Sequence, residues 1–294
     1  MAELNLEGLG VALITPFNPD NSIDFSSLEK IVNHTIEGGC DYLVALGTTA
    51  ETPTLSLLEK EKITRFICEI NNNRVPLVVG IGGNNTSAVC HDILSRDLSG
   101  YSAILSVAPF YNKPTQEGLY QHFKAISEAS PLPVILYNVP GRTGVNLTAI
   151  TTLKLCALGD VIAGLKDASG NPEQSKEIIE AAPKNFSLFS GNDSDTMELM
   201  KQGAKGVISV LANAMPRQMK KLVKLCQERN YVEASAYQKE LKPLIGHLFE
   251  DGNPAGVKAL LSESGLCKNI LRLPLMPVSK KVEEHILKEA SKFQ

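Results

Sequence analysis

The hydrophobic residues of this chain follow two patterns that alternate along the sequence. Short, almost continuously apolar runs, of which residues 9–15 are the first, are separated by longer segments whose apolar residues recur at helical spacing. A short apolar run is typical of a parallel strand buried on both faces, and the longer segments indicate amphipathic helices. The pattern therefore predicts repeated βα units around a parallel sheet.

Eight apolar runs are each followed by a helical pattern. The predicted strands are residues 9–15, 42–46, 76–81, 103–107, 134–137, 161–166, 186–190 and 206–210. Eight βα units are the number that closes a (β/α)8 TIM barrel, and we predict this fold. An open, doubly wound sheet is the alternative, but Thr15-Pro16 stands where its glycine-rich G-x-G-x-x-G turn would follow the first strand.

The βα alternation stops after a helix predicted near residues 216–228. From Tyr231 onward only helical patterns remain, at about residues 232–249, 254–263 and 279–292. We predict a catalytic barrel over residues 1–229 and an all-helical C-terminal appendage over residues 230–294. We expect the appendage to pack against the barrel or against a neighbouring subunit.

Composition and charge exclude several kinds of partner. The formal net charge of −3 gives no basic excess for binding nucleic acid or an anionic membrane. No segment reaches the roughly 18 apolar residues of a membrane helix, and the first residues lack a signal-peptide pattern, so we expect a cytoplasmic protein. The six cysteines form no C-x-x-C pair, and no histidines stand at ligand spacing, so we expect reduced cysteines and no metal site or cofactor.

Lys166 is the most informative single residue, because it ends the sixth predicted strand. A lysine at this position lies at the mouth of a barrel, partly removed from water. Burial disfavours the charged ammonium and favours the neutral amine, which can attack a carbonyl. A lysine that merely finishes a strand and extends into solvent is the alternative for this segment taken alone.

Further hydroxyl groups follow strands whose carboxyl ends share the same mouth. Thr48 follows the second strand, Tyr111 follows the fourth and Tyr137 ends the fifth. An amine nucleophile needs a nearby acid and base while a carbinolamine collapses to an imine, so we predict a proton relay through these hydroxyls. For each residue alone, core packing of the tyrosine or helix capping by the threonine is the alternative.

Two features suit the carboxylates of a substrate. The turn at Gly47-Thr48-Thr49 precedes a helix and offers N–H groups and hydroxyls to an anion, which points to an α-keto acid. Arg142, between Gly141 and Gly144, is suited to a second carboxylate through its planar guanidinium. An exposed arginine in a glycine loop is the alternative.

Four segments together resemble the dihydrodipicolinate synthase family of barrels, which form a Schiff base with pyruvate. They are GTTAET at residues 47–52, YNKP at 111–114, YNVPGRTG at 137–144 and GLKDASG at 164–170. The resemblance implies condensation of pyruvate with aspartate semialdehyde in lysine and diaminopimelate biosynthesis. A pyruvate-dependent sugar-acid aldolase, of the sialic acid or keto-deoxy-gluconate type, is the alternative, but such enzymes generally lack the Gly-Arg-Thr-Gly turn.

The resemblance also implies a role for each candidate residue. Lys166 carries the imine, the three hydroxyls form the relay, and Arg142 binds the carboxylate of the semialdehyde. The remaining substrate-binding candidates are Thr49, Gly191 and Ile208. In the family the tyrosine that matches Tyr111 crosses a tight dimer interface, which implies a homotetramer built as a dimer of dimers.

Regulation is expected to differ from that of lysine-sensitive family members. Those members carry a histidine, a tyrosine and an acid at a lysine site between subunits, where this chain has Leu57, Lys60, Phe110 and Ala88. Without an acidic partner, the amines of a bound lysine would lie unpaired beside Lys60, which is costly. We predict weak or absent feedback by lysine.

Overall fold

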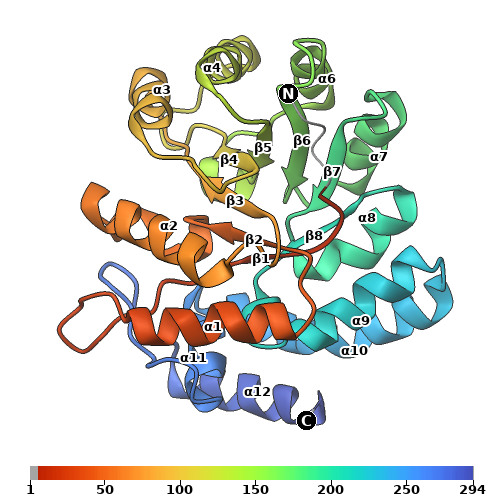
Figure 1. Ribbon diagram of the computed structural model, residues 1–294. Helices are drawn as coiled ribbons and strands as arrows, with labels where there is room; N and C mark the ends of the chain where they lie inside the picture. The colour runs from red at the N-terminus through yellow and green to blue at the C-terminus, as the bar shows by residue number, and fades with distance from the viewer. Residues whose placement is uncertain (1–5, 294) are drawn as a thin grey trace.

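A closed barrel of eight parallel strands forms the centre of the computed structural model, which describes residues 6–293. Each strand pairs with the next along the chain, and β8 pairs with β1 to close the ring (Figure 1). This confirms the predicted TIM barrel. The strands are β1 (Gly8–Ala12), β2 (Tyr42–Ala45), β3 (Leu77–Gly80), β4 (Ala103–Val107), β5 (Val134–Asn138), β6 (Ile162–Asp167), β7 (Ser187–Ser190) and β8 (Gly206–Ser209).

Helices alternate with the strands and surround the barrel. Side-chain caps stabilise the first turns of most of these helices, such as the capping box that Ser56 and Glu59 form at the start of α2. The helix predicted to reach about residue 98 ends earlier, because the backbone at Arg96 is extended. The helices are α1 (Phe25–Glu37), α2 (Leu57–Asn71), α3 (Thr86–Ser95), α4 (Gln116–Ala129), α5 (Pro140–Thr143), α6 (Ala149–Cys156), α7 (Pro172–Ala181), α8 (Thr196–Gln202) and α9 (Pro216–Gln227).

Three helices complete the chain: α10 (Tyr231–Glu250), α11 (Ala255–Glu263) and α12 (Lys280–Ala290). They pack on one another, and α10 also packs on α8 and α9, so the appendage lies along one side of the barrel (Figure 1). The predicted C-terminal helices are therefore present. The division of the chain into two domains at residues 229 and 230 stays a prediction.

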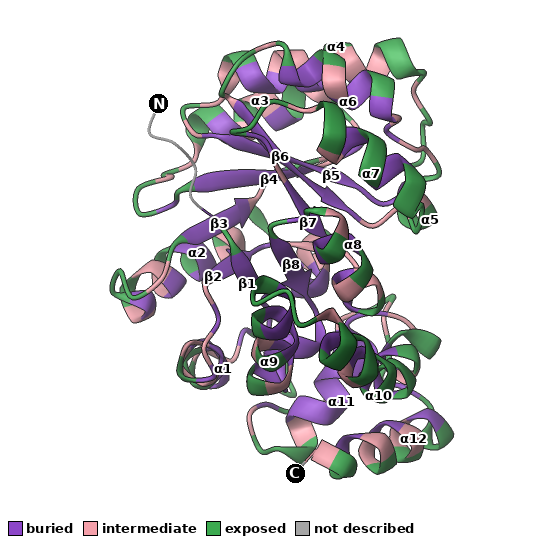
Figure 2. Cartoon of the chain, turned by 90° about the vertical axis from the view of Figure 1, so that its right-hand side faces the viewer, coloured by how far each residue is buried: buried purple, intermediate pink, exposed green. Residues whose placement is uncertain are grey.

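The alternation of side chains along each strand creates two apolar cores. One core fills the barrel and contains Tyr42, Leu105, Tyr137, Phe189 and Ile208. The other lies between the strands and the surrounding helices, and the buried strands and exposed outer helix faces are visible in Figure 2. Within residues 6–293, no helix combines the length and the apolar character needed to cross a membrane.

Candidate active site

Lys166 and Tyr137 occupy paired positions on β6 and β5, close to the carboxyl ends of these strands. The Lys166 Nζ lies 4.4 Å from the centre of the Tyr137 ring, which belongs to the core inside the barrel. Lys166 is only 5% exposed, so it is removed from water more completely than its place at a strand end suggested. The structure therefore places an amine beside a phenol in the barrel interior.

A buried polar network holds the strand ends behind these two residues. Asp167 follows Lys166, and its carboxylate accepts hydrogen bonds from Asn138 Nδ2 at 3.2 Å and Ser175 Oγ at 2.6 Å. Burial raises the pKa of the Asp167 carboxyl, and its hydrogen bonds oppose that rise. Because strand residues alternate in direction, this network fixes β5 and β6 from the outside while Tyr137 and Lys166 point inward.

Asp193 is a further buried acid near Lys166, and the sequence analysis gave it no role. Its Oδ2 accepts hydrogen bonds from the backbone N–H groups of Val210 at 3.0 Å and Leu211 at 2.9 Å. Its Oδ1 has no partner among the residues that the structure describes. Burial raises the pKa of the Asp193 carboxyl, and its hydrogen bonds, followed by the charge of Lys166, oppose the rise. The sequence does carry a signal for Asp193, because it lies two residues after Gly191, directly beyond the end of a predicted strand.

A cavity of about 440 Å³ opens beside Tyr137 at the same end of the barrel. Its walls include Tyr137, Thr48 and Arg142. Thr48 begins a short 3-10 turn after β2, and Arg142 lies on the single turn of α5 after β5. The volume suits a small-molecule ligand. The structure thus brings three of the predicted residues to one cavity, with Lys166 next to it against the Tyr137 ring.

Other predicted residues lie outside the cavity wall. Tyr111 is 89% exposed, has a left-handed backbone with φ of 73°, and does not line the cavity. Thr49 is buried, and its hydroxyl accepts a hydrogen bond from Asn253 Nδ2 at 3.1 Å. Ile208 is buried in the core inside the barrel.

Gly191 is required by the packing of β7 against β6. Its N–H donates to the carbonyl oxygen of Asp167 at 2.7 Å. A Cβ at this position would lie 3.0 Å from that oxygen and 2.8 Å from the Cβ of Ala168. A larger residue would therefore displace the end of the strand that carries Lys166.

The appendage is connected to the turn that contains Thr48. Lys258, on α11, forms an ion pair with Glu51, and neither side chain is exposed. Glu51 has a left-handed φ of 53° and also accepts a hydrogen bond from the N–H of Arg272 at 3.0 Å. Burial lowers the pKa of Lys258, and the charge of Glu51 opposes this. Sequence analysis missed the pair, because no local pattern relates residues 207 positions apart.

The fold and this site define an enzyme with a buried lysine at the mouth of a (β/α)8 barrel, and comparisons with known proteins identify its family. A sequence profile of the "Dihydrodipicolinate synthetase family" matches residues 5–292 of this chain. The 4-hydroxy-tetrahydrodipicolinate synthase of Parabacteroides distasonis is 49% identical over 94% of this chain and 93% of its own length. The protein of the same name from Azobacteroides pseudotrichonymphae is 47% identical over 100% of this chain and 99% of its own length.

A solved structure agrees with these sequence relatives. The dihydrodipicolinate synthase of Acinetobacter baumannii, in complex with pyruvate, has a TM-score of 0.94 and 40% identity, with 98% of each chain covered. The chain belongs to the dihydrodipicolinate synthetase family. These findings confirm the resemblance seen in the sequence, and with it the expectation of a lyase-type synthase.

Proposed function

We propose that Lys166 forms a Schiff base with pyruvate and that this chain condenses the bound pyruvate with L-aspartate 4-semialdehyde. The product is 4-hydroxy-tetrahydrodipicolinate, the compound for which the relatives are named, and it leads to diaminopimelate and lysine. The observation that carries the proposal is the Lys166 Nζ at 4.4 Å from the Tyr137 ring, beside a cavity of suitable size. The reaction uses no cofactor, because the imine formed by Lys166 serves as the electron sink.

The residues have separate tasks in this scheme. The neutral Nζ attacks the keto carbon, and the carbinolamine loses its hydroxyl as water when a proton reaches it from the Tyr137 hydroxyl. The Tyr137 oxygen, deprotonated in that step, takes a methyl proton from the imine and leaves an enamine. The enamine carbon attacks the aldehyde, whose oxygen takes the proton back from Tyr137 as the imine forms again. The amino group of the semialdehyde then attacks the imine carbon, closes the ring and releases the Lys166 amine. Thr48 and Tyr111 return protons to Tyr137.

The two carboxylates are held at different places. The turn after β2, with the N–H groups of Thr48 and Thr49, receives the carboxylate of pyruvate, while Arg142 in the cavity wall receives that of the semialdehyde. The hydroxyl of Thr49 accepts a hydrogen bond from Asn253 and keeps its own O–H to donate to the carboxylate of pyruvate. Gly191 and Ile208 shape the floor of the site.

The exposed Tyr111 supports an oligomer as part of this proposal. Phe110 and Tyr111 are adjacent and exposed, and the exposed Leu57 and Leu58 add to the apolar surface of this chain. We assign Tyr111 to the relay of a second subunit, in a homotetramer that is a dimer of dimers, located in the cytoplasm. Such an assembly covers the tyrosine that otherwise lies in water.

Trapping with borohydride tests the nucleophile. Pyruvate and borohydride should add mass to the peptide that contains Lys166, and Lys166→Ala should abolish the adduct. Lys60 lines the same cavity, so Lys60→Ala is the matched control and should still trap pyruvate. An adduct on another peptide would overturn the site, and no adduct would favour a non-catalytic, ligand-sensing barrel.

A substrate comparison tests the reaction itself. Coupled assays with pyruvate and aspartate semialdehyde should show turnover that depends on both compounds. Release of pyruvate from a sialic or keto-deoxy-sugar acid, with no response to the semialdehyde, would instead identify a sugar-acid aldolase. Trapping alone does not separate these two activities, since both proceed through the same imine.

A further inference from the structure

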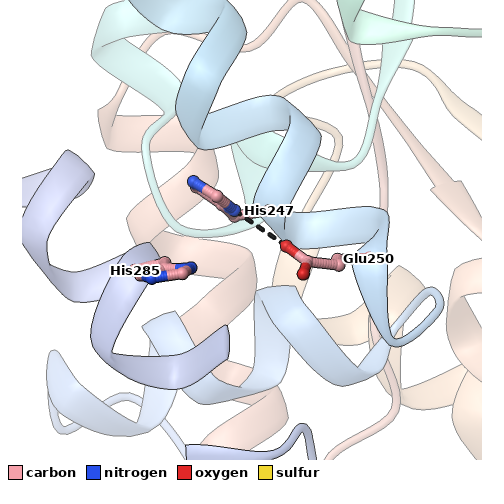
Figure 3. Close-up of side chains that lie close together, drawn as sticks. All are labelled: His247, Glu250 and His285. Carbon is pink, nitrogen blue, oxygen red and sulfur yellow. Dashed lines mark hydrogen bonds and ion pairs between the residues drawn. The ribbon is translucent and has the colours of Figure 1, made fainter. Parts of the chain in front are cut away.

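A cluster of two histidines and one carboxylate lies on the appendage, outside the cavity described above (Figure 3). His247 and Glu250 stand three positions apart on α10, and His285 lies on the facing α12. One ring nitrogen of each histidine and one carboxylate oxygen lie within 4.8 Å of one another. The three side chains come from two helices and converge on one point.

We propose that His247, Glu250 and His285 bind a divalent transition-metal ion, with Zn²⁺ as the preferred ion. Two imidazoles and one carboxylate are a donor set that Zn²⁺ takes with a fourth position left for water. Mg²⁺ and Ca²⁺ prefer oxygen ligands, so the two nitrogens disfavour them. The site is distinct from the Schiff-base chemistry, which needs no metal.

The geometry is close to that of a bound ion. Bonds of about 2.0–2.1 Å to a tetrahedral Zn²⁺ place ligand atoms about 3.3 Å apart. The His247 Nδ1 already lies 2.9 Å from the Glu250 Oε2, and the ring centres of His247 and His285 are 4.8 Å apart. Small side-chain rotations are therefore enough to bring the three donors to one ion, and the exposed Glu250 is free to make such a movement.

An unpaired nitrogen is the second observation that points to a ligand. The Nδ1 of His285 is buried and has no hydrogen-bond partner among residues 6–293. A buried polar atom without a hydrogen-bond partner is costly. A metal bound at Nδ1 would be the missing partner, and a metal bound at Nε2 would fix the tautomer and so decide whether Nδ1 carries a proton.

The bound ion would act on the structure of the appendage. α10 and α12 pack against each other, so an ion shared between them links the last helix of the chain to the long helix beside the barrel. Binding to the folded state alone raises stability with the concentration of free metal. The sequence gave no sign of this site, because His285 comes from a different helix and no ligand spacing relates it to His247.

Calorimetry with metal-free, untagged protein tests the proposal. Titration with ZnCl₂ should show one ion per chain and a higher melting temperature with zinc. His247→Asn and His285→Asn should each weaken Zn²⁺ binding more than tenfold. His91→Asn, an exposed histidine on α3 outside the cluster, should bind as the parent does.

Two outcomes would overturn the proposal. One is a parent protein that binds no Zn²⁺ at micromolar concentrations. The other is a His247→Asn/His285→Asn double variant that binds as tightly as the parent, which would place the ion elsewhere, for example on the partly exposed Cys68 or Cys90. Circular dichroism without metal shows that each variant is folded. Co²⁺ absorption adds a direct readout, because nitrogen and oxygen ligands give a spectrum without the thiolate charge-transfer band.

Discussion

Lys258 of the appendage and Glu51 of the turn after β2 form an ion pair that has no exposed side-chain surface. The Lys258 Nζ also donates to the carbonyl oxygen of Ile270 at 2.8 Å. Loss of one partner leaves the other charge buried and unpaired, so Lys258→Met should lower the free energy of unfolding by about 3–5 kcal/mol. Urea denaturation at pH 7 measures this change.

A double variant separates the ion pair from simple packing at the same place. Glu51→Leu/Lys258→Met removes both charges and should regain part of the lost stability, because no buried charge remains. Recovery should be incomplete, since the N–H of Arg272 and the carbonyl of Ile270 each lose a partner. A double variant less stable than the sum of the two single changes would contradict this account.

The barrel could be predicted from the sequence because its signals are local. Each buried strand is a short apolar run, and the helices between strands have their own caps and periodicity, so element positions differ from the prediction by only a few residues. Strand order also followed, since consecutive βα units pair in sequence. The exact ends of the helices and strands could not be predicted, because they depend on backbone conformations such as the extended one at Arg96.

The site could be predicted only in part. Lys166, Tyr137, Thr48 and Arg142 stand at strand ends, and the barrel brings strand ends together. Contacts that depend on three-dimensional proximity of distant segments were missed, such as the ion pair of Lys258 with Glu51. No periodic pattern encodes the exposure of Tyr111; only the family resemblance, which places the matching tyrosine at a dimer interface, implied it.

Tyr137→Phe tests the proton relay. The ring remains beside Lys166, so the fold and the position of the amine should be preserved, while the hydroxyl that moves protons is lost. General acid–base catalysis contributes about 10²- to 10⁴-fold, and kcat should fall by this factor. Tyr120→Phe, on α4 away from the cavity, is the control and should keep full turnover. A Tyr137→Phe enzyme with normal kcat would remove this residue from the relay.

Arg142→Ala tests whether the two carboxylates are held separately. The variant should still form the trapped pyruvate adduct, because the amine and the turn after β2 are unchanged. Loss of a charged hydrogen bond costs about 1.5–3 kcal/mol, so kcat/KM for the semialdehyde should fall about 10- to 100-fold. Arg142→Lys should recover little, since an ammonium lacks the planar fork. Equal loss of pyruvate trapping would show that both substrates depend on this residue.

His122 should make stability depend on pH. Its ring is buried on α4, its Nδ1 lies 2.8 Å from Thr86 Oγ1, and burial lowers its pKa to about 4. As the pH falls below 6.5 the unfolded chain takes up a proton, whereas the folded chain stays neutral until about pH 4. The free energy of unfolding is therefore highest above pH 6.5 and falls on acidification, by about 2 kcal/mol between pH 7 and pH 5.

His122→Asn isolates this contribution. Asparagine keeps a polar group near Thr86 but does not titrate, so the difference in unfolding free energy between pH 7 and pH 5 should shrink by the same amount. Urea melts of both proteins at the two pH values provide the measurement. An unchanged pH slope in the variant would assign the acid sensitivity to groups other than His122. The buried carboxyls of Asp167 and Asp193 are not such groups, because a raised pKa favours the folded state on acidification.

Feedback by L-lysine should be weak, because Asp92, the one acid among the described residues that line the cavity with Lys60, is already paired with an arginine. Burial lowers the pKa of Lys60, and the adjacent Asp92 is already bound bidentately by Arg96, at 2.7 and 2.8 Å. Ala88 lies in the neighbouring hollow and contributes no charge. Millimolar L-lysine should therefore change turnover by less than twofold in the coupled assay.

Ala88→Glu adds an acid to the hollow at a position that is exposed, on α3. If an unpaired amine is what prevents binding, this change should lower the concentration of L-lysine needed for inhibition, and Ala88→Gln, of equal size without the charge, should not. Strong inhibition of the parent enzyme would show that another group pairs with the amine. Glu61, which lines the same hollow, is then the residue to replace first.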